Sequence, residues 1–495
     1  MTNWTPGDPI RDSDDYRQSL RGRGLNVYVM GEQVAEPIDH PIVRPSINAM
    51  ATTYDLAESE PDVAQASSSL SGDRVNRFLH VAESVDDVVA QNRMQRKLGQ
   101  MTGTCFQRCV GMDAINATYS VTYDIDAERG TDYHRRFKTW LAQIQLKNLV
   151  IGGAMTDPKG DRSKAPSQQD DPDLFVRVTE RRPDGVVIRG AKAHQTGALN
   201  AHWVIVMPTI RLRAADSDYA ITCAVPTTAS GIIYVYGRQS CDTRALEGGD
   251  VDVGNANFSG QEVLIIFDDV FVPTEQIFMD GEWEYASELV ERFTSYHRRS
   301  YVCKTGVGDV LIGAAALAAD HNGVAGSSHI KDKLVEMAHL NETIYATGIA
   351  ASHESFRRPA GNFENDGLLA NVCKQNVTRF PYEMGRLAQD LAGGLMVTMP
   401  SQQDFEDPDV GPTLDRLFQG RADVPTQDRR RILRLIENMT MGRNAVGYLT
   451  ESLHGAGSPQ AQRVQIARQV DFDARKLMAA RLAGVKTGSP ADPAE

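Results

Sequence analysis

Apolar and polar residues alternate with a helical period through the first part of the chain. The clearest run has apolar residues at steps of three and four, which predicts one buried helical face that carries Met94, Leu98, Met101, Cys105, Cys109 and Met112. We therefore expect residues 1–145 to form a mainly helical N-terminal domain.

The pattern changes at about residue 146 to short runs rich in β-branched residues. Segments such as "VVIRGAKAH" and "QEVLIIFDDVFVP" are separated by Pro, Gly and Asp turns, which is typical of a β-barrel or sandwich. Strands do not alternate with helices, and no GxGxxG motif follows a strand, so a Rossmann domain is not expected. We predict a middle β-barrel domain over residues 146–280.

From residue 281 the pattern is helical again. Long amphipathic stretches such as "TQDRRRILRLIENMTMGRNAVGYLTESLHG" predict a C-terminal helical bundle over residues 281–495, and the last segment, "TGSPADPAE", is expected to be a frayed tail. The whole pattern therefore predicts an α+β multidomain fold.

Composition narrows the possible partners. The chain has 495 residues and a formal net charge of −13, and it has no run of Lys and Arg long enough to cover a nucleic acid or an anionic membrane. No uninterrupted apolar stretch reaches the roughly 18 residues that a membrane helix requires. Six cysteines are too few to hold a fold of this size together by disulfides. We expect a cytoplasmic protein with free or metal-bound thiols and with neither a nucleic-acid nor a membrane partner.

The segment "FTSYHRRSYVCKTG", residues 293–306, brings His297 and Cys303 close together. Cys105 and Cys109, four residues apart on the predicted helix, would point in similar directions. Three cysteines and a histidine suit a zinc ion or an iron–sulfur cluster. Free cysteine is also among the most buried residue types, so core packing explains the CxxxC pair as well, and His297 taken alone fits an ordinary surface or core position. The other cysteines have no neighbouring ligands and are interpreted as packing residues: Cys223, Cys241 and Cys373.

Three further segments combine small and polar residues. The loop 153–166, "GAMTDPKGDRSKAP", and Thr196 in "AKAHQTG" expose groups that can bond a flat ring or a phosphate, and both also fit ordinary connections. In "TESLHGAGSPQAQR", residues 450–463, Glu451 is a candidate for proton transfer beside a glycine-rich corner, although the local sequence taken alone favours a helix C-cap with exposed polar groups. Glu262 starts a strand, where an acid is usually solvated.

As a set, these segments resemble the 4-hydroxybutyryl-CoA dehydratases, a group within the 4-hydroxyphenylacetate 3-hydroxylase superfamily that has an acyl-CoA dehydrogenase-like fold. The resemblance runs through nearly the whole chain, in "YRQSLRGRGLNVYVMGEQV", "CFQRC", "AKAHQTG", "FDDVFVP", "YHRRSYVCKTGVGDVLIGA" and "TESLHGAGSPQAQR". It implies a helical N-terminal domain, a middle β domain and a C-terminal bundle that together hold FAD and an oxygen-sensitive [4Fe–4S] cluster. It also implies an acyl-CoA substrate and a homotetramer.

The resemblance further implies roles for individual residues. The cluster ligands would be Cys105, Cys109, His297 and Cys303. The candidates for proton transfer or orientation would be His297, Tyr301, Glu451 and Glu262, with Gln107 and Lys304 beside the cluster ligands. The flavin contacts would come from Met155, Thr156 and Thr196 and from the corner formed by Gly455, Gly457 and Ser458.

The reaction that the resemblance implies is a radical dehydration of 4-hydroxybutyryl-CoA to crotonyl-CoA, with isomerisation of vinylacetyl-CoA as a partial activity. A transient one-electron oxidation by FAD would make the C3 proton acidic enough to remove. One position departs from the resemblance: the dehydratases carry "SYGGCK", whereas this chain reads "SYVCK", so the loop between His297 and Cys303 is one residue shorter.

Two other functions stay open at this point. One is a two-component flavin monooxygenase that hydroxylates aromatic rings and needs no iron ligands. The other is a non-catalytic scaffold that binds flavin or acyl-CoA, because a fold alone does not fix an activity.

Overall fold

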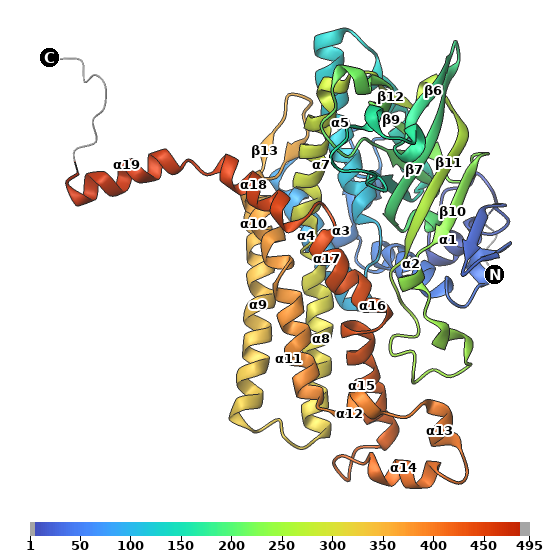
Figure 1. The fold of residues 1–495 in the computed structure, drawn as a ribbon, viewed down its shortest axis with the longest axis vertical. Helices are drawn as coiled ribbons and strands as arrows, with labels where there is room; N and C mark the ends of the chain where they lie inside the picture. Colours follow the sequence, from blue (N-terminus) through green and yellow to red (C-terminus); the bar gives the residue numbers. More distant parts are fainter. Residues whose placement is uncertain (1–4, 486–495) are drawn as a thin grey trace.

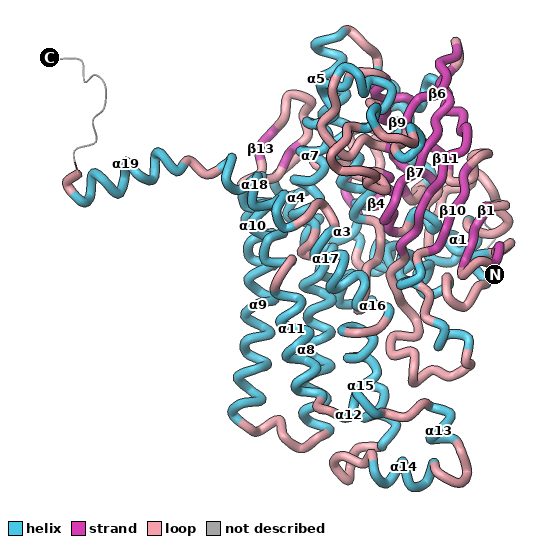
Figure 2. The backbone as a smooth tube through the Cα atoms, viewed as in Figure 1, coloured by secondary structure: helices cyan, strands magenta, loops and turns pink. Residues whose placement is uncertain are grey.

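The structure is a computed structural model that describes residues 5–485. Strands gather on one side of the molecule and long helices on the other (Figures 1 and 2). The tail predicted at residues 487–495 lies outside the described residues.

Helices dominate the N-terminal part, as the apolar pattern predicts. Ser84 caps the start of α4 by accepting a hydrogen bond from the Asp87 amide, and Gly103 ends this helix with a φ of 60°. The helices of this part are α1 (Ser13–Ser19), α2 (Arg44–Ser59), α3 (Pro61–Ala64), α4 (Val85–Thr102), α5 (Cys109–Arg129) and α6 (Tyr133–Lys147).

Two sheets form the β part of the fold. The larger has the strand order β2-β1-β10-β11-β7-β6, and the smaller has the order β12-β9-β8-β5. Their strands are β1 (Asn26–Val29), β2 (Glu32–Gln33), β5 (Ile151–Ala154), β6 (Arg177–Arg182), β7 (Gly185–Thr196), β8 (Trp203–Val206), β9 (Ile221–Pro226), β10 (Ile232–Tyr236), β11 (Glu262–Pro273) and β12 (Ile277–Asp280). Two small hairpins, β3 (Gln65–Ser67) with β4 (Arg74–Asn76) and β13 (Phe356–Arg357) with β14 (Phe363–Glu364), complete the strands among residues 5–485.

The prediction of a closed β-barrel is not confirmed. In the described part of the chain, β2 and β6 end the larger sheet and β12 and β5 end the smaller one, so both sheets are open. Within the larger sheet, β11 pairs with β7 in antiparallel fashion and sets Glu262 opposite Thr196. Two candidate site residues are therefore placed by strand register.

The C-terminal half is helical, as predicted. A π-helical turn, Val446–Thr450, stands directly before α17. The helices are α7 (Ala286–Ser300), α8 (Cys303–His321), α9 (Ser328–His353), α10 (Gly367–Val377), α11 (Phe380–Ala392), α12 (Leu395–Thr398), α13 (Gln402–Glu406), α14 (Gly411–Leu417), α15 (Thr426–Thr440), α16 (Arg443–Ala445), α17 (Glu451–His454), α18 (Pro459–Gln469) and α19 (Phe472–Ala483).

Glycines let α8 approach α4 closely. A Cβ at Gly306 would lie 2.0 Å from the carbonyl oxygen of Arg96, and one at Gly99 would lie 2.6 Å from the carbonyl oxygen of Cys303. This contact places the start of α8 against the N-terminal helices. By length and composition the stretch Trp283–His321 could cross a membrane, and 67 % of its apolar window is buried inside the fold, which a core helix would also show.

The helix α19 extends away from the body of the molecule (Figure 1). Its apolar side chains Leu477, Met478 and Leu482 are 55 %, 58 % and 83 % exposed. The last helix therefore leaves an apolar face uncovered by the described part of its own chain.

Candidate active site

The four predicted cluster ligands come from separate segments. Cys105 lies in the turn between α4 and α5, Cys109 is the first residue of α5, His297 belongs to α7, and Cys303 is the first residue of α8. The prediction that Cys105 and Cys109 share one helical face is wrong, because α4 ends at its glycine cap and α5 begins only at Cys109. A left-handed glycine ends a helix while the apolar spacing of the sequence continues unchanged past it.

The three cysteines share one buried neighbourhood. The Cys109 thiol donates a hydrogen bond to the Cys303 sulfur, which lowers the pKa of Cys303, whereas burial raises the pKa of Cys109. Gln95 Nε2 donates to Cys109 Sγ over 3.3 Å. Burial and then the Glu451 carboxylate raise the pKa of Cys105. Cys105 therefore lies within electrostatic reach of the acid that was predicted to move protons.

The ligands do not converge on one metal ion. Among residues 5–485, no three His, Cys, Asp or Glu side chains lie close enough together to hold a single ion. This geometry gives the zinc alternative no support. A [4Fe–4S] cluster makes a different demand, because each iron takes its own ligand and the ligand atoms stand apart around the cube.

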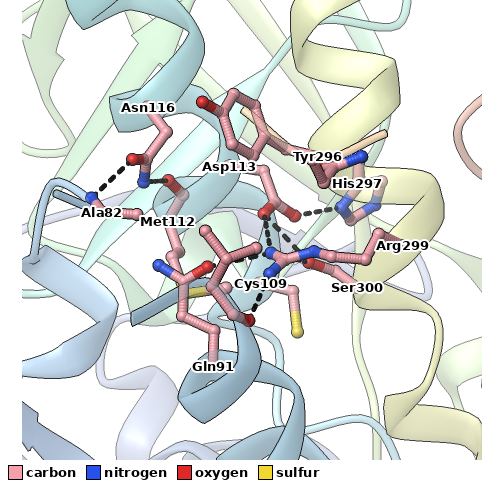
Figure 3. A network of polar contacts seen from close by, with 12 residues as sticks. Ala82, Gln91, Cys109, Met112, Asp113, Asn116, Tyr296, His297, Arg299 and Ser300 are labelled. Atoms are coloured by element: carbon pink, nitrogen blue, oxygen red, sulfur yellow. Dashed lines mark hydrogen bonds and ion pairs between the residues drawn. The ribbon is translucent and has the colours of Figure 1, made fainter. Parts of the chain in front are cut away.

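A buried carboxylate holds the ring of His297 (Figure 3). His297 Nδ1 lies 2.8 Å from Asp113 Oδ2, and Ser300 Oγ donates to Asp113 Oδ1 over 2.9 Å. The buried guanidinium of Arg299 lies 3.6 Å from the same Oδ1. A carboxylate at Nδ1 keeps the ring proton on that nitrogen and leaves Nε2 free to act as a ligand.

Sequence reasoning missed Asp113. The residue stands in the helical segment "CVGMDAINA", four positions after Cys109 and among mostly small and apolar neighbours. A buried charged residue is seldom unpaired, so a lone aspartate among small and apolar helix residues was the available sign of a buried ion pair.

Four predicted residues form two adjoining polar pairs. Lys304 Nζ lies 3.0 Å from Glu451 Oε2, and Thr196 Oγ1 donates to Glu262 Oε1 over 2.7 Å. Burial and then the Glu451 charge raise the pKa of Glu262 well above 4.5. Burial opposes the charge on Lys304, but Glu451, Cys303 and Cys105 together outweigh it and raise the pKa of this lysine. An acid at the start of a strand is usually solvated. Glu262 is instead hydrogen-bonded within the protein.

Tyr301 lies at the centre of this group. Its ring centroid is 5.2 Å from that of His297, and the Nζ of the buried Lys374 lies 3.7 Å from the Tyr301 ring centroid. The Tyr301 hydroxyl is 3.4 Å from the Glu451 carbonyl oxygen. A Cβ at Gly455 would lie 1.7 Å from that hydroxyl, so this glycine makes room for the tyrosine. Lys374 was not among the predicted residues.

Gln107 has a structural place in the turn that carries Cys105. Its φ is 70°, in the left-handed region that non-glycine residues rarely adopt. Its amide donates to the carbonyl oxygens of Ser46 at 2.8 Å and Ser259 at 3.2 Å, and its Oε1 accepts from Asn200 at 3.0 Å. These bonds tie the turn to α2 and to the segment before β11.

Met155 and Thr156 follow β5, and a buried lysine fixes the path of this strand exit. Lys192 Nζ donates to the carbonyl oxygens of Met155 at 2.8 Å and Met207 at 2.7 Å, and it pairs with Asp157 at 2.6 Å. The Thr156 carbonyl oxygen accepts from the backbone of β7 over 2.7 Å. Sequence reasoning missed Lys192, although it lies in the segment "AKAHQTG".

The glycine-rich corner follows α17. Gly455 caps that helix, Ala456 and Gly457 have φ values of 56° and 96°, and Ser458 precedes α18. Arg298 Nε donates to the Ala456 carbonyl oxygen over 3.0 Å. The corner is therefore anchored to α7, one residue from His297.

Charged groups after β5 and at the end of α17 act on the end of β7. Burial lowers the pKa of His194 on β7, and the charges of Lys159 and His454 lower it further. Lys159 follows β5, and the exit of β5 is hydrogen-bonded to β7 through the Thr156 carbonyl oxygen. His454 ends α17, so the end of this helix lies within electrostatic reach of β7.

Comparisons with known proteins agree along the whole chain. The sequence profile "4-hydroxyphenylacetate 3-hydroxylase N terminal" matches residues 12–279, and the corresponding C-terminal profile matches residues 286–484. The chain is 54 % identical over 489 residues to the 4-hydroxybutyryl-CoA dehydratase/vinylacetyl-CoA-Delta-isomerase of Clostridium aminobutyricum, which covers 96 % of this chain and 100 % of that one.

Solved structures show the same fold. An oxygen-tolerant archaeal 4-hydroxybutyryl-CoA dehydratase from N. maritimus superposes with a TM-score of 0.96 at 63 % identity, over 98 % of this chain and 97 % of that one. The oxygenase component HpaB of 4-hydroxyphenylacetate 3-monooxygenase, complexed with FAD, superposes with a TM-score of 0.83 at 23 % identity, over 95 % of this chain and 98 % of that one. A glutaryl-coenzyme A dehydrogenase superposes with a TM-score of 0.51 at 13 % identity, over 96 % of this chain and 94 % of that one.

Proposed function

The chain belongs to the 4-hydroxyphenylacetate 3-hydroxylase family, and from this premise we propose that it catalyses the dehydration of 4-hydroxybutyryl-CoA to crotonyl-CoA, with isomerisation of vinylacetyl-CoA as an associated activity. The relative from Clostridium aminobutyricum carries both activities in its name. The observation that carries the proposal is the gathering of three cysteines and a carboxylate-held histidine beside the pair of Lys304 and Glu451.

The donor set fits a [4Fe–4S] cluster. Cys105, Cys109 and Cys303 supply thiolates from separate segments, and the free Nε2 of His297 supplies a fourth donor. The one-residue-shorter loop does not carry Cys303 out of reach, because its sulfur still accepts a hydrogen bond from Cys109.

FAD is the second cofactor of the proposal. The HpaB structures obtained with FAD share this fold, and here the exit of β5 is hydrogen-bonded to β7, while His454 at the end of α17 lies within electrostatic reach of His194 on β7. Met155, Thr156 and Thr196 would line the ring of the flavin. When bound, the flavin supplies one-electron redox chemistry and the cluster supplies a Lewis-acidic iron.

The dehydration removes one proton from C2 and one from C3, releases the C4 hydroxyl as water with one proton, and returns the other proton to C4. We assign the C2 proton and the departing hydroxyl to acids and bases of this chain. Removal of the C2 proton needs a base, and we assign this role to Glu451, whose Oε2 is held 3.0 Å from Lys304 Nζ. Departure of the C4 hydroxyl needs an acid, and the raised pKa of Glu262 keeps its carboxyl protonated at a pH where an ordinary glutamate is ionised. Two carboxyl groups with different environments thus take opposite roles.

The test is anaerobic purification, followed by measurement of iron, acid-labile sulfide and flavin and by an assay with 4-hydroxybutyryl-CoA. We expect about four irons per chain with FAD, as a [4Fe–4S] cluster requires, and formation of crotonyl-CoA. Cys303→Ser should lose iron and turnover, whereas the control Cys241→Ser, which alters a buried thiol outside the group, should keep both.

The alternative monooxygenase gives a different result in the same preparation. Flavin without iron, together with oxygen-dependent hydroxylation of 4-hydroxyphenylacetate, would replace the dehydratase proposal. Flavin binding with neither activity would leave the scaffold function.

Self-association, as a homotetramer, is also part of the proposal. The exposed apolar face of α19, with Leu477, Met478 and Leu482, supports contact with another copy, because such a face is rarely left in water. Light scattering of the full chain should give a tetramer, and replacing the three residues by serine should weaken it. A monomer for the unmodified chain would contradict this part.

A further inference from the structure

Lys374 is a buried lysine without a carboxylate partner. Its side chain, on α10, is fully buried, and among the described residues no Asp or Glu forms an ion pair with it, since Glu451 pairs with Lys304. Burial and then the charge of Lys304 lower the pKa of Lys374 well below 10.5, and the Glu451 charge opposes this shift without reversing it. Burying a lysine without an ion-pair partner is unfavourable, so its presence here directs attention to the specific contacts of its amine.

The amine of Lys374 makes two contacts, and both lead to the active site. Its Nζ donates a hydrogen bond to the carbonyl oxygen of Ser452, in the short helix that begins with Glu451. Its Nζ also lies 3.7 Å from the ring centroid of Tyr301. The last carbonyl groups of a helix lack partners within it, so a side-chain donor at the Ser452 carbonyl oxygen helps to hold α17 in place.

The two contacts couple Tyr301 to Glu451. The tyrosine hydroxyl already fits against Gly455, where a Cβ would lie 1.7 Å away, and it lies 3.4 Å from the carbonyl oxygen of Glu451. One end of the tyrosine is therefore set by the corner after α17 and its ring face by Lys374. A shift of the amine would move the ring and the helix relative to each other.

We propose that Lys374 is a positioning residue for the dehydration: it holds the Tyr301 ring and the α17 helix in one arrangement, so that the tyrosine hydroxyl and the Glu451 carboxylate keep their relative places at the substrate. The Lys374 side chain is fully buried, and its two contacts are with protein groups, the Tyr301 ring and the Ser452 carbonyl oxygen. This inference rests on the proposed function, because it assigns Tyr301 and Glu451 to that reaction.

Lys374→Met tests the proposal, since methionine fills a similar volume and has no donor. We expect kcat to fall by about 10- to 100-fold, because a displacement of about 1 Å at a reacting group has an effect of that order, while KM for 4-hydroxybutyryl-CoA and the iron and flavin contents stay within twofold. Lys374→Gln, which retains a shorter donor, should recover part of the loss. The matched control is Cys373→Ala on the same helix, also fully buried, which should reduce stability without lowering kcat.

Two outcomes would overturn the proposal. One is a Lys374→Met enzyme with intact cofactors and kcat within twofold of the unmodified enzyme. The other is an equal fall in kcat for Cys373→Ala, which would mean that general packing of α10 is responsible. If Lys374→Met does not fold, the same comparison is made with Lys374→Gln.

A structural measurement separates this inference from the proposed function. If the unmodified chain has no dehydratase activity, the proposed function fails, and crystal structures of the unmodified chain and of Lys374→Met then decide the role of the lysine. A displaced Tyr301 ring and a shifted α17 in the variant support positioning. A ring and helix in unchanged places reject it.

Discussion

Asp113→Asn tests most directly how the ring of His297 is held. The change removes one negative charge and keeps the shape of the side chain. Asp113 is 1 % exposed and Arg299 is fully buried, so the variant leaves a guanidinium in the core without its carboxylate. Removing one partner of a buried pair costs about 3–5 kcal/mol. The 3.6 Å separation is longer than a direct hydrogen bond, so we expect a loss near the lower end, about 3 kcal/mol.

The same change should also switch the tautomer of His297. Ser300 and Arg299 both present donors to one oxygen of Asp113, so the asparagine oxygen should face them and its NH₂ group should face His297. An NH₂ donor at Nδ1 moves the ring proton to Nε2, which then cannot bind iron. Loss of such an outer partner typically weakens metal affinity about 10- to 100-fold.

Two measurements check the reasoning. Urea unfolding of the iron-free protein gives the change in the free energy of unfolding, and iron analysis of the anaerobic protein gives cluster content. The control is Asp124→Asn on the same helix, whose carboxylate pairs with Arg292 and is 26 % exposed; it should cost less stability and leave iron unchanged. Normal iron content in Asp113→Asn, or equal iron loss in the control, would refute the tautomer argument.

Three further changes have defined outcomes. Gly455→Ala would place a Cβ 1.7 Å from the Tyr301 hydroxyl, so steady-state kinetics should show kcat about 100-fold lower with little change in KM, and an unchanged kcat would contradict the fit. In Gly306→Ala the added Cβ would lie 2.0 Å from a carbonyl oxygen of α4, so urea unfolding should show a free energy of unfolding about 3 kcal/mol lower. The control is Gly313→Ala on the same helix, where the added Cβ has no atom within 4 Å; it should raise the free energy of unfolding by about 1 kcal/mol. The folded-state pKa of Glu262 lies above 4.5, so the unmodified protein loses stability as pH rises from about 4.5 toward that pKa. Glu262→Gln cannot ionise, so its stability relative to the unmodified protein should increase between pH 4 and pH 8. A difference in stability that does not depend on pH would count against the assignment.

The order of helix, strand and helix could be predicted because each period is repeated over many residues. Closure of the sheets could not, because it depends on pairing between distant segments. The strand β1 joins the larger sheet by pairing Asn26 with Ile233, and no local pattern around either residue contains that pairing. The sheets consequently have free edges where a barrel was expected.

The candidate site was predicted better in its residues than in its geometry. Cys105 and Cys109 do lie near Cys303. A turn between α4 and α5 places them there, whereas the apolar period alone predicts a continuous helix. Lys192 and Lys374 could not be singled out, because a buried lysine looks in sequence like a solvated one. What distinguishes these two lysines is that each donates a hydrogen bond to a carbonyl oxygen distant along the chain, 15 positions away for Lys192 and 78 for Lys374.

The π-helical turn at Val446–Thr450 has a consequence for how this protein tolerates deletions. A π turn holds one residue more than the α-helical turn it replaces, and its backbone is the less favourable of the two. Deleting one residue there would turn the π turn into a regular helical turn and would leave the residues beyond it close to their present alignment. Glu451, the next residue along, would then still face Lys304. A deletion in the regular turns of α15 would instead rotate everything beyond it by about 100°, so this short stretch is where the chain can lose a residue and keep its acid in place.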